Sequence, residues 1–211
     1  MTDLRAVMAL AALAACGLYL LSAVLLVRLE AGLRWRDLLW RTISSHALGA
    51  GKGRFDTYGV AMITGALCQA LAVTLHGGFG WAVPGLMLLM VAMLAGLLLF
   101  PTDSHEVAPG HHPVRARQRQ GYIHLYFATG CFGTAGMIVL LAEPKMALLL
   151  SGPALWAMDW LAILVTAMLT MLAVTGFWGP LQTWFGLAER AFFYATALWF
   201  FLAALALVVG G

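Results

Sequence analysis

Hydrophobic residues run along this chain in long blocks that short polar stretches separate. A helix needs about 20 predominantly apolar residues to cross the hydrocarbon core of a bilayer. Six blocks reach that length, and none of them has a charge near its centre. The first block runs too long for a signal peptide, so we expect a retained helix there. The pattern predicts six spans, at residues 6–27, 57–76, 81–100, 121–142, 153–176 and 188–209.

An even number of spans places both chain ends on one face of the membrane, which we name side A; the opposite face is side B. Only Arg5 and Lys145 belong to side A. The other lysines and arginines fall on side B: Arg28, Arg34, Arg36, Arg41, Lys52, Arg54, Arg115, Arg117, Arg119 and Arg190. Cytoplasmic loops carry an excess of these residues, so the sequence predicts that side B faces the cytoplasm.

The loop between the first two spans has a helical pattern of its own. Between Ala31 and His46, the apolar residues Trp35, Leu39 and Ile43 recur at helical spacing, and polar residues occupy another line. A helix with one apolar and one charged face lies in the membrane interface. We therefore expect an amphipathic helix at 31–46 on side B.

The composition agrees with a membrane protein and excludes other classes. Of 211 residues, 63% are hydrophobic and 10% are charged, whereas a soluble domain has about a quarter charged residues. The net charge of +3 is small and its basic residues are spread over loops, which argues against nucleic-acid binding. We expect an all-α, polytopic membrane protein with a single transmembrane domain over residues 1–211.

Polar residues of several spans converge on side B. Ionisable groups at a membrane face need partners or a function, because burial without partners is costly. We assign candidate catalytic roles to His124, Asp103 and Ser44, with the histidine and the aspartate as acid and base. We assign binding of an anionic group to Arg190, His46 and Arg41, since a guanidinium pairs well with phosphate.

Metal and haem chemistry have weaker support. The donors Asp103, His105, His111, His112 and His124 share side B, but their spacing matches no fixed zinc motif. His76 and His124 lie at opposite faces and cannot share one haem iron. Ser44, His124 and Asp103 could form a nucleophilic triad, although no nucleophile-elbow motif is present. We therefore predict no metal and no cofactor.

Two other function classes stay open. Asp159 lies within the fifth span, and with Thr166 and Thr170 at helical spacing it could serve a small transporter. Threonines at this spacing are more typical of hydrogen bonds between helices than of a transport path. A non-catalytic accessory subunit of a larger membrane complex, or a homo-oligomer, also fits a chain whose catalytic motifs are weak.

The residues just named also carry a family resemblance. The segment from Arg41 to Gly49, the residues Phe100 to Asp103, His124, and the segment from Gly186 to Arg190 with Trp199 resemble the bacterial six-helix membrane family catalogued as domain of unknown function 998. The likeness covers about residues 8 to 208. This family is distantly similar to eukaryotic six-helix proteins of the Frag and DRAM type, which are linked to lipid handling.

The resemblance implies signature positions but no reaction. These positions are Ser44, Pro101, Asp103, His124 and Arg190. It also implies a multi-pass protein of the bacterial inner membrane with membrane lipids as partners. Together with the polar residues of side B, it leads us to expect that the protein binds or modifies an anionic lipid or another amphiphile.

Overall fold

The structure is a computed structural model that describes residues 2–48, 51–102 and 119–210. These residues form helices and connecting turns, with no strand among them. The long helices are α1 (Thr2–Glu30), α3 (Lys52–His76), α4 (Ala82–Leu99), α5 (Arg119–Met146), α6 (Gly152–Phe177) and α7 (Phe185–Gly210). The short ones are α2 (Trp35–Trp40) and the 3-10 segments η1 (Ile43–Ala47), η4 (Ala147–Leu149) and η5 (Gly179–Trp184).

The six predicted spans correspond one to one with the six long helices. Each long helix has the length and apolar composition needed to cross a membrane. The predicted all-α polytopic bundle is therefore confirmed. The helices extend past several predicted boundaries, and α1 continues to Glu30 rather than ending at residue 27.

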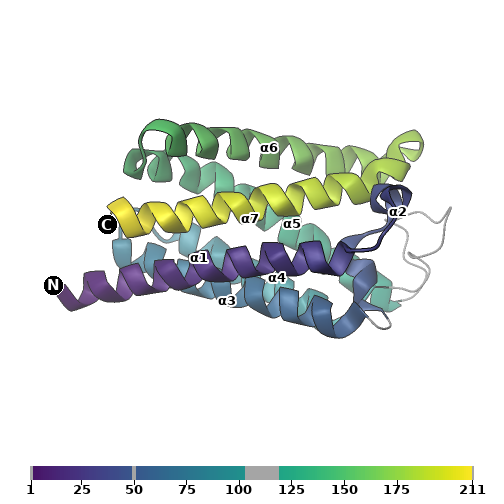
Figure 1. Cartoon of the computed structure of the whole chain (residues 1–211), viewed down its shortest axis with the longest axis horizontal. Coiled ribbons are helices and arrows are strands. Elements are labelled where there is room, and N and C mark those ends of the chain that lie inside the picture. Colours follow the sequence, from purple (N-terminus) through teal and green to yellow (C-terminus); the bar gives the residue numbers. More distant parts are fainter. Residues whose placement is uncertain (1, 49–50, 103–118, 211) are drawn as a thin grey trace.

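The long helices are arranged as a closed ring in which neighbours along the chain are neighbours in space. Contacts join α1 to α3, α3 to α4, α4 to α5, α5 to α6 and α6 to α7, and α7 also packs on α1. Figure 1 shows both chain ends at one end of the bundle and α2 at the other. This placement agrees with the expected topology, in which the termini share side A and the long loops share side B.

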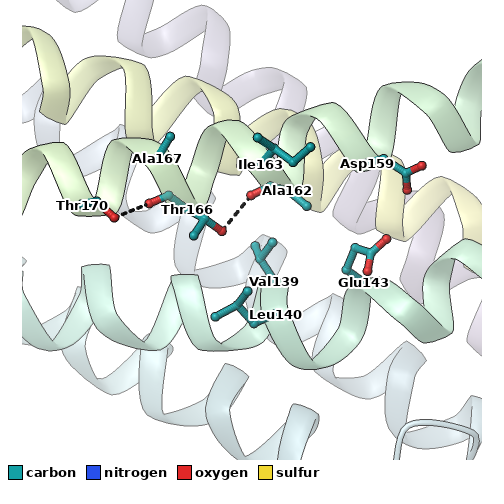
Figure 2. A pocket seen from close by; sticks show the side chains of 9 residues that line it. All are labelled: Val139, Leu140, Glu143, Asp159, Ala162, Ile163, Thr166, Ala167 and Thr170. Carbon is teal, nitrogen blue, oxygen red and sulfur yellow. Dashed lines mark hydrogen bonds between the residues drawn. The ribbon is translucent and has the colours of Figure 1, made fainter.

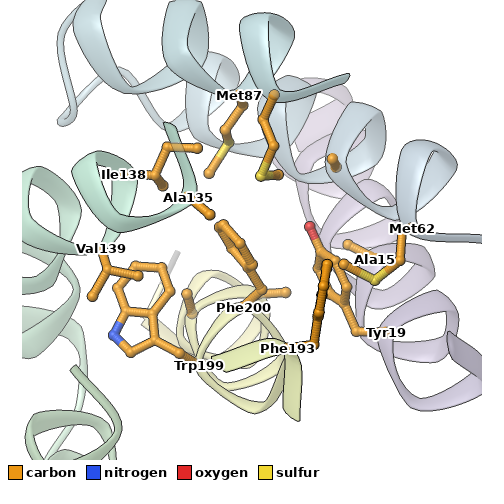
Figure 3. Close-up of a cluster of buried hydrophobic side chains, with 14 of the residues drawn as sticks. Ala15, Tyr19, Met62, Met87, Ala135, Ile138, Val139, Phe193, Trp199 and Phe200 are labelled. Carbon is orange, nitrogen blue, oxygen red and sulfur yellow. The ribbon is translucent and has the colours of Figure 1, made fainter. Parts of the chain in front are cut away.

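The core lies around α7. Trp199 and Phe200 of this helix are fully buried, and the Phe200 ring stacks on Tyr19 of α1 at 5.5 Å between ring centroids. Figure 3 shows Phe200 in the middle of this cluster, with Tyr19 on one side and Ile138 of α5 on the other. Small residues of α7, including Ala203, let the neighbouring helices approach. Helix α7 therefore contributes much of the buried core of the ring, and it packs mainly against α1 and α6.

The predicted interfacial helix at 31–46 is wrong in its extent. The structure has the single short helix α2, then two extended residues, and then η1. Arg41 has φ −71° and ψ 134°, and Thr42 has φ −75° and ψ 152°. The amphipathic pattern indicates helical structure in this segment, but contacts with α7 break its helix, as described below. Its position in the membrane interface stays a prediction.

Candidate functional site

Two adjacent charged residues lie in the second turn of α7 and are buried in the bundle. Glu189 and Arg190 are each 4% exposed. Charged groups at such positions are costly unless they are paired and hydrogen-bonded. Their partners therefore decide what this region of side B can do.

Arg190 joins three parts of the chain. Its Nε forms an ion pair with Glu30 Oε1 at the end of α1, at 2.5 Å. Its Nη1 donates hydrogen bonds to the backbone carbonyls of Leu38, at 2.9 Å, and Arg41, at 2.5 Å. The same nitrogen lies 2.9 Å from the carbonyl of Gly186, one turn earlier in α7. The guanidinium thus holds the interfacial segment and the end of α1 against α7.

These bonds explain why the interfacial helix ends early. The carbonyls of Leu38 and Arg41 point at Arg190 instead of accepting bonds from a continuing helix. The approach also needs a residue without a side chain on α7, because a Cβ at Gly186 would collide with the Arg41 carbonyl oxygen and lie 3.0 Å from that of Leu38. The break at residues 41–42 is therefore imposed by tertiary contacts.

Glu189 holds the next residues of the same segment. Its Oε2 accepts a hydrogen bond from the Ile43 backbone N–H at 2.7 Å. A small cavity of about 30 Å³ lies beside it, with Ser44 and Tyr58 among its lining residues. A space of this size holds about one water molecule. Glu189 and Arg190 together fix the backbone from residue 38 to residue 43.

Arg41 and His46 belong to this segment, and Arg190 is bonded to the Arg41 carbonyl. Both guanidinium groups are near enough to His46 to act on it electrostatically. Four of their nitrogens are buried and have no hydrogen-bond partner within the described part of the chain: Arg41 Nε, His46 Nε2, Arg190 Nη2 and Arg190 Nε. Arg190 Nε has the ion pair with Glu30, which leaves the other three without any partner there. The structure therefore brings together the three residues that the sequence assigns to anion binding.

The pKa of His46 reports the character of this site. Burial lowers it most, and the charges of Arg41 and Arg190 lower it further, from the ordinary value of 6.5 to about 4. A positive neighbourhood disfavours a further positive charge. His46 is consequently neutral near pH 7, and the site favours the addition of negative charge.

The residues assigned to catalysis have other partners. The Nδ1 of His124 lies 2.7 Å from the Phe100 carbonyl at the end of α4. The Ser44 hydroxyl donates to Thr42 Oγ1 at 3.1 Å. Asp103 lies outside the described residues, as do His105, His111 and His112. Their roles in catalysis or metal binding stay predictions.

Sequence reasoning missed three side chains of this region. Glu30 pairs with Arg190, and Glu189 holds Ile43. Tyr194, one turn along α7 from Arg190, lies close enough to Glu30 to interact with it electrostatically. A signal for Glu189 was present, because it sits beside Arg190 at the start of an apolar span. The sequence gives no comparable signal for Glu30, since an acid at the end of a span is ordinarily solvated.

The fifth predicted span has its own polar residues. Asp159 of α6 and Glu143 of α5 line a groove of about 580 Å³ between these helices, with Thr166 and Thr170 further along it (Figure 2). The threonine hydroxyls donate to the carbonyls of Ala162 and Thr166 within α6. They do not link two helices, which the spacing alone had left open.

Comparison with known proteins places the chain without assigning it an activity. The family model described as protein of unknown function, DUF998, matches residues 13–206. No curated protein and no solved structure matches the chain.

Proposed function

This chain belongs to the DUF998 family, whose function is unknown, and we propose that it binds an anionic lipid headgroup at side B. The binding groups are Arg41, His46 and Arg190. The segment of α2 and η1 borders the site on the side of the membrane surface. The chain is a multi-pass membrane protein, so lipids surround it on all sides and are available as ligands.

The observation that carries this proposal is the set of unpartnered nitrogens. Leaving a buried donor without an acceptor costs about 1–3 kcal/mol, and more for a charged group. Arg190 Nη2, Arg41 Nε and, in its Nε2–H tautomer, His46 are three such donors in one place. A phosphate has several acceptor oxygens and a negative charge, and it would satisfy these donors together.

The surrounding charges support the same ligand. Arg34, directly before α2, and Arg36 on α2 are exposed, and Arg28 is exposed on the last turn of α1. Trp35 is 66% exposed on the same short helix, as expected of an aromatic side chain at the headgroup level of a membrane. Anionic lipids are attracted to clusters of basic residues near a membrane surface.

We also propose that the protein lies in the bacterial inner membrane with side B facing the cytoplasm. Ten lysines and arginines on side B against two on side A favour a cytoplasmic side B in a bacterial inner membrane. The proposal does not include a reaction. Because Ser44 and His124 bond to Thr42 and Phe100, binding is the activity that the contacts support.

Lipid retention by matched variants tests the proposal. We would purify the protein in a non-ionic detergent and measure the anionic phospholipid that remains bound by mass spectrometry. Arg41→Gln removes a guanidinium from the site while its backbone carbonyl can still bond to Arg190. Arg36→Gln removes the same charge from the exposed face of α2 and serves as the control.

We expect Arg41→Gln to reduce bound anionic lipid by about tenfold, the effect of losing hydrogen bonds to a charged group. His46→Gln should reduce it less, and Arg36→Gln should leave it near the wild-type level. Equal retention in the wild type and in both site variants would overturn the proposal.

An accessory subunit is the second candidate, because α6 is little covered. In its most apolar stretch 22% of the residues are buried, against 56% for α3 and α7. A partner subunit or a second copy could pack there. Purification under native conditions tests this function: a larger assembly that dissociates on substitution of exposed α6 residues supports it, and a lone stable chain excludes it.

A further inference from the structure

A groove runs between α5 and α6, away from the residues proposed to bind an anionic headgroup. Its volume is about 580 Å³, and most of its wall is apolar, from residues such as Val139 and Ile163. The groove opens along helices that cross the membrane. Figure 2 shows Glu143 and Asp159 facing one another across its side A end. A groove with a long apolar wall and charged groups at one end is complementary to an amphiphile, which has an apolar chain and a polar headgroup.

The groove carries negative charge at the end where Glu143 and Asp159 lie, and no ion pair with a basic residue is found there in the described ranges. The Glu143 and Asp159 carboxyl groups lie close enough to act on each other electrostatically, and two acids placed in this way concentrate negative charge at this end of the groove. Within the described ranges, the ion pairs are Arg34–Asp37, Lys52–Asp56 and Arg190–Glu30, so neither acid has a basic partner there. The nearby Lys145 lies over the Phe79 ring, 5.9 Å from its centroid.

The position of Glu143 and Asp159 across the membrane corresponds to the level of the lipid headgroups. Trp156 and Trp160 flank Asp159 on α6, and they are 65% and 55% exposed. Their rings pack edge to face at 6.0 Å between centroids. Tryptophans exposed in this way mark the boundary between headgroups and acyl chains. The carboxyl pair therefore lies at the level of the headgroups of side A.

We infer that this groove binds a phospholipid with a primary amine headgroup, phosphatidylethanolamine being the simplest. The ammonium supplies one positive charge and three N–H donors to the Glu143–Asp159 pair. The acyl chain lies along the wall past Thr166 and Thr170, whose hydroxyls are already bonded within α6. A choline headgroup carries the same charge but no N–H, so the site distinguishes the two lipids. This site is separate from the proposed anionic site at side B.

Competition between two lipids tests the inference. We would reconstitute the protein in nanodiscs of equal parts phosphatidylethanolamine and phosphatidylcholine, extract it gently, and measure both lipids by native mass spectrometry. The wild type should retain about threefold more of the amine lipid than of the choline lipid, as expected for a half-exposed ion pair with hydrogen bonds. This measurement needs no variant, so misfolding cannot obscure it.

Variants then test whether Glu143 and Asp159 are the residues that cause the preference for the amine lipid. Glu143→Gln with Asp159→Asn should abolish it, whereas Asp56→Asn, which removes an exposed carboxylate from side B, should preserve it. Retention of anionic lipid should be unchanged in the double variant, which separates this inference from the function proposed above. Equal retention of the two lipids by the wild type would overturn the inference. So would a double variant that keeps the preference, or one that changes the oligomeric state instead of the bound lipid.

Discussion

Arg190 of α7 and Glu30 of α1 form a buried ion pair, 2.5 Å between Nε and Oε1, that joins the last span of the bundle to the first. The side chains are 5% and 10% exposed. The same guanidinium holds the carbonyls of the interfacial segment. One residue therefore closes the ring of helices at side B and positions the segment that borders the proposed lipid site.

Arg190→Ala should destabilise the bundle strongly. It leaves Glu30 buried without its cation, and breaking a buried pair from one side costs about 3–5 kcal/mol. Thermal unfolding in detergent would show the loss as a lower midpoint. Arg28→Ala, which removes an exposed arginine from the last turn of α1, is the control and should have little effect. A wild-type midpoint in Arg190→Ala would contradict the role given to the pair.

Gly186→Ala should displace the interfacial segment. The added Cβ would meet the carbonyl oxygens of Arg41 and Leu38, which are backbone atoms that cannot turn aside. We expect faster proteolysis between residues 38 and 43 and a lower unfolding midpoint. Gly53→Ala is the matched control, because a Cβ there meets nothing within 4 Å. Identical digestion of both variants would show that the close approach is unimportant.

The stability of the protein should depend on pH through His46. Its pKa is lowered from 6.5 to about 4 in the folded protein, by burial first and then by Arg41 and Arg190. The unfolded chain therefore binds more protons between pH 4 and 6.5, so stability is fully present above pH 6.5 and is lost as pH falls through that window. His46→Gln should flatten the dependence of the unfolding midpoint on pH. A slope unchanged in this variant would assign the dependence to other groups.

Binding of an anion should raise the pKa of His46. A phosphate between Arg41 and Arg190 would offset their charges, which favours the protonated imidazole. By linkage, binding takes up a proton, and affinity for the anionic lipid increases as pH falls from 7. Titration of the His46 ring by NMR, with and without anionic lipid in the detergent micelle, measures the shift directly. Equal pKa values in the two conditions would place the anion elsewhere.

His124 should contribute to stability through the end of α4. A carbonyl can only accept, so the ring donates from Nδ1 to the Phe100 oxygen, which the helix itself leaves unsatisfied. His124→Leu should lower the free energy of unfolding by about 1–3 kcal/mol. His124→Gln keeps an N–H donor and should recover part of that loss. If both variants unfold like the wild type, the hydrogen bond is not structural.

The membrane topology could be predicted from the sequence because it depends on local composition. A block of about 20 apolar residues has few alternatives to a spanning helix. The same reasoning placed Arg41, His46 and Arg190 on one face, since each follows or precedes a span. The structure brings them together, although their binding role stays a proposal.

The interfacial segment could not be predicted as closely. Nothing in the local sequence at Arg41 and Thr42 breaks a helix, since neither residue is a glycine or a proline. The break comes from Glu189 and Arg190, which lie about 150 residues later and take the backbone groups that a helix would use. The pairing of Glu143 with Asp159 likewise depends on how α5 and α6 pack, which hydrophobic periodicity does not encode.

A density map of the protein in nanodiscs that contain anionic phospholipid tests the central claim most directly. The account predicts a phosphate within hydrogen-bond distance of Arg190 Nη2 and Arg41 Nε, with His46 beside it. A well-ordered map in which the three side chains contact only protein or water, while anionic lipids occupy other surfaces of the bundle, would contradict it.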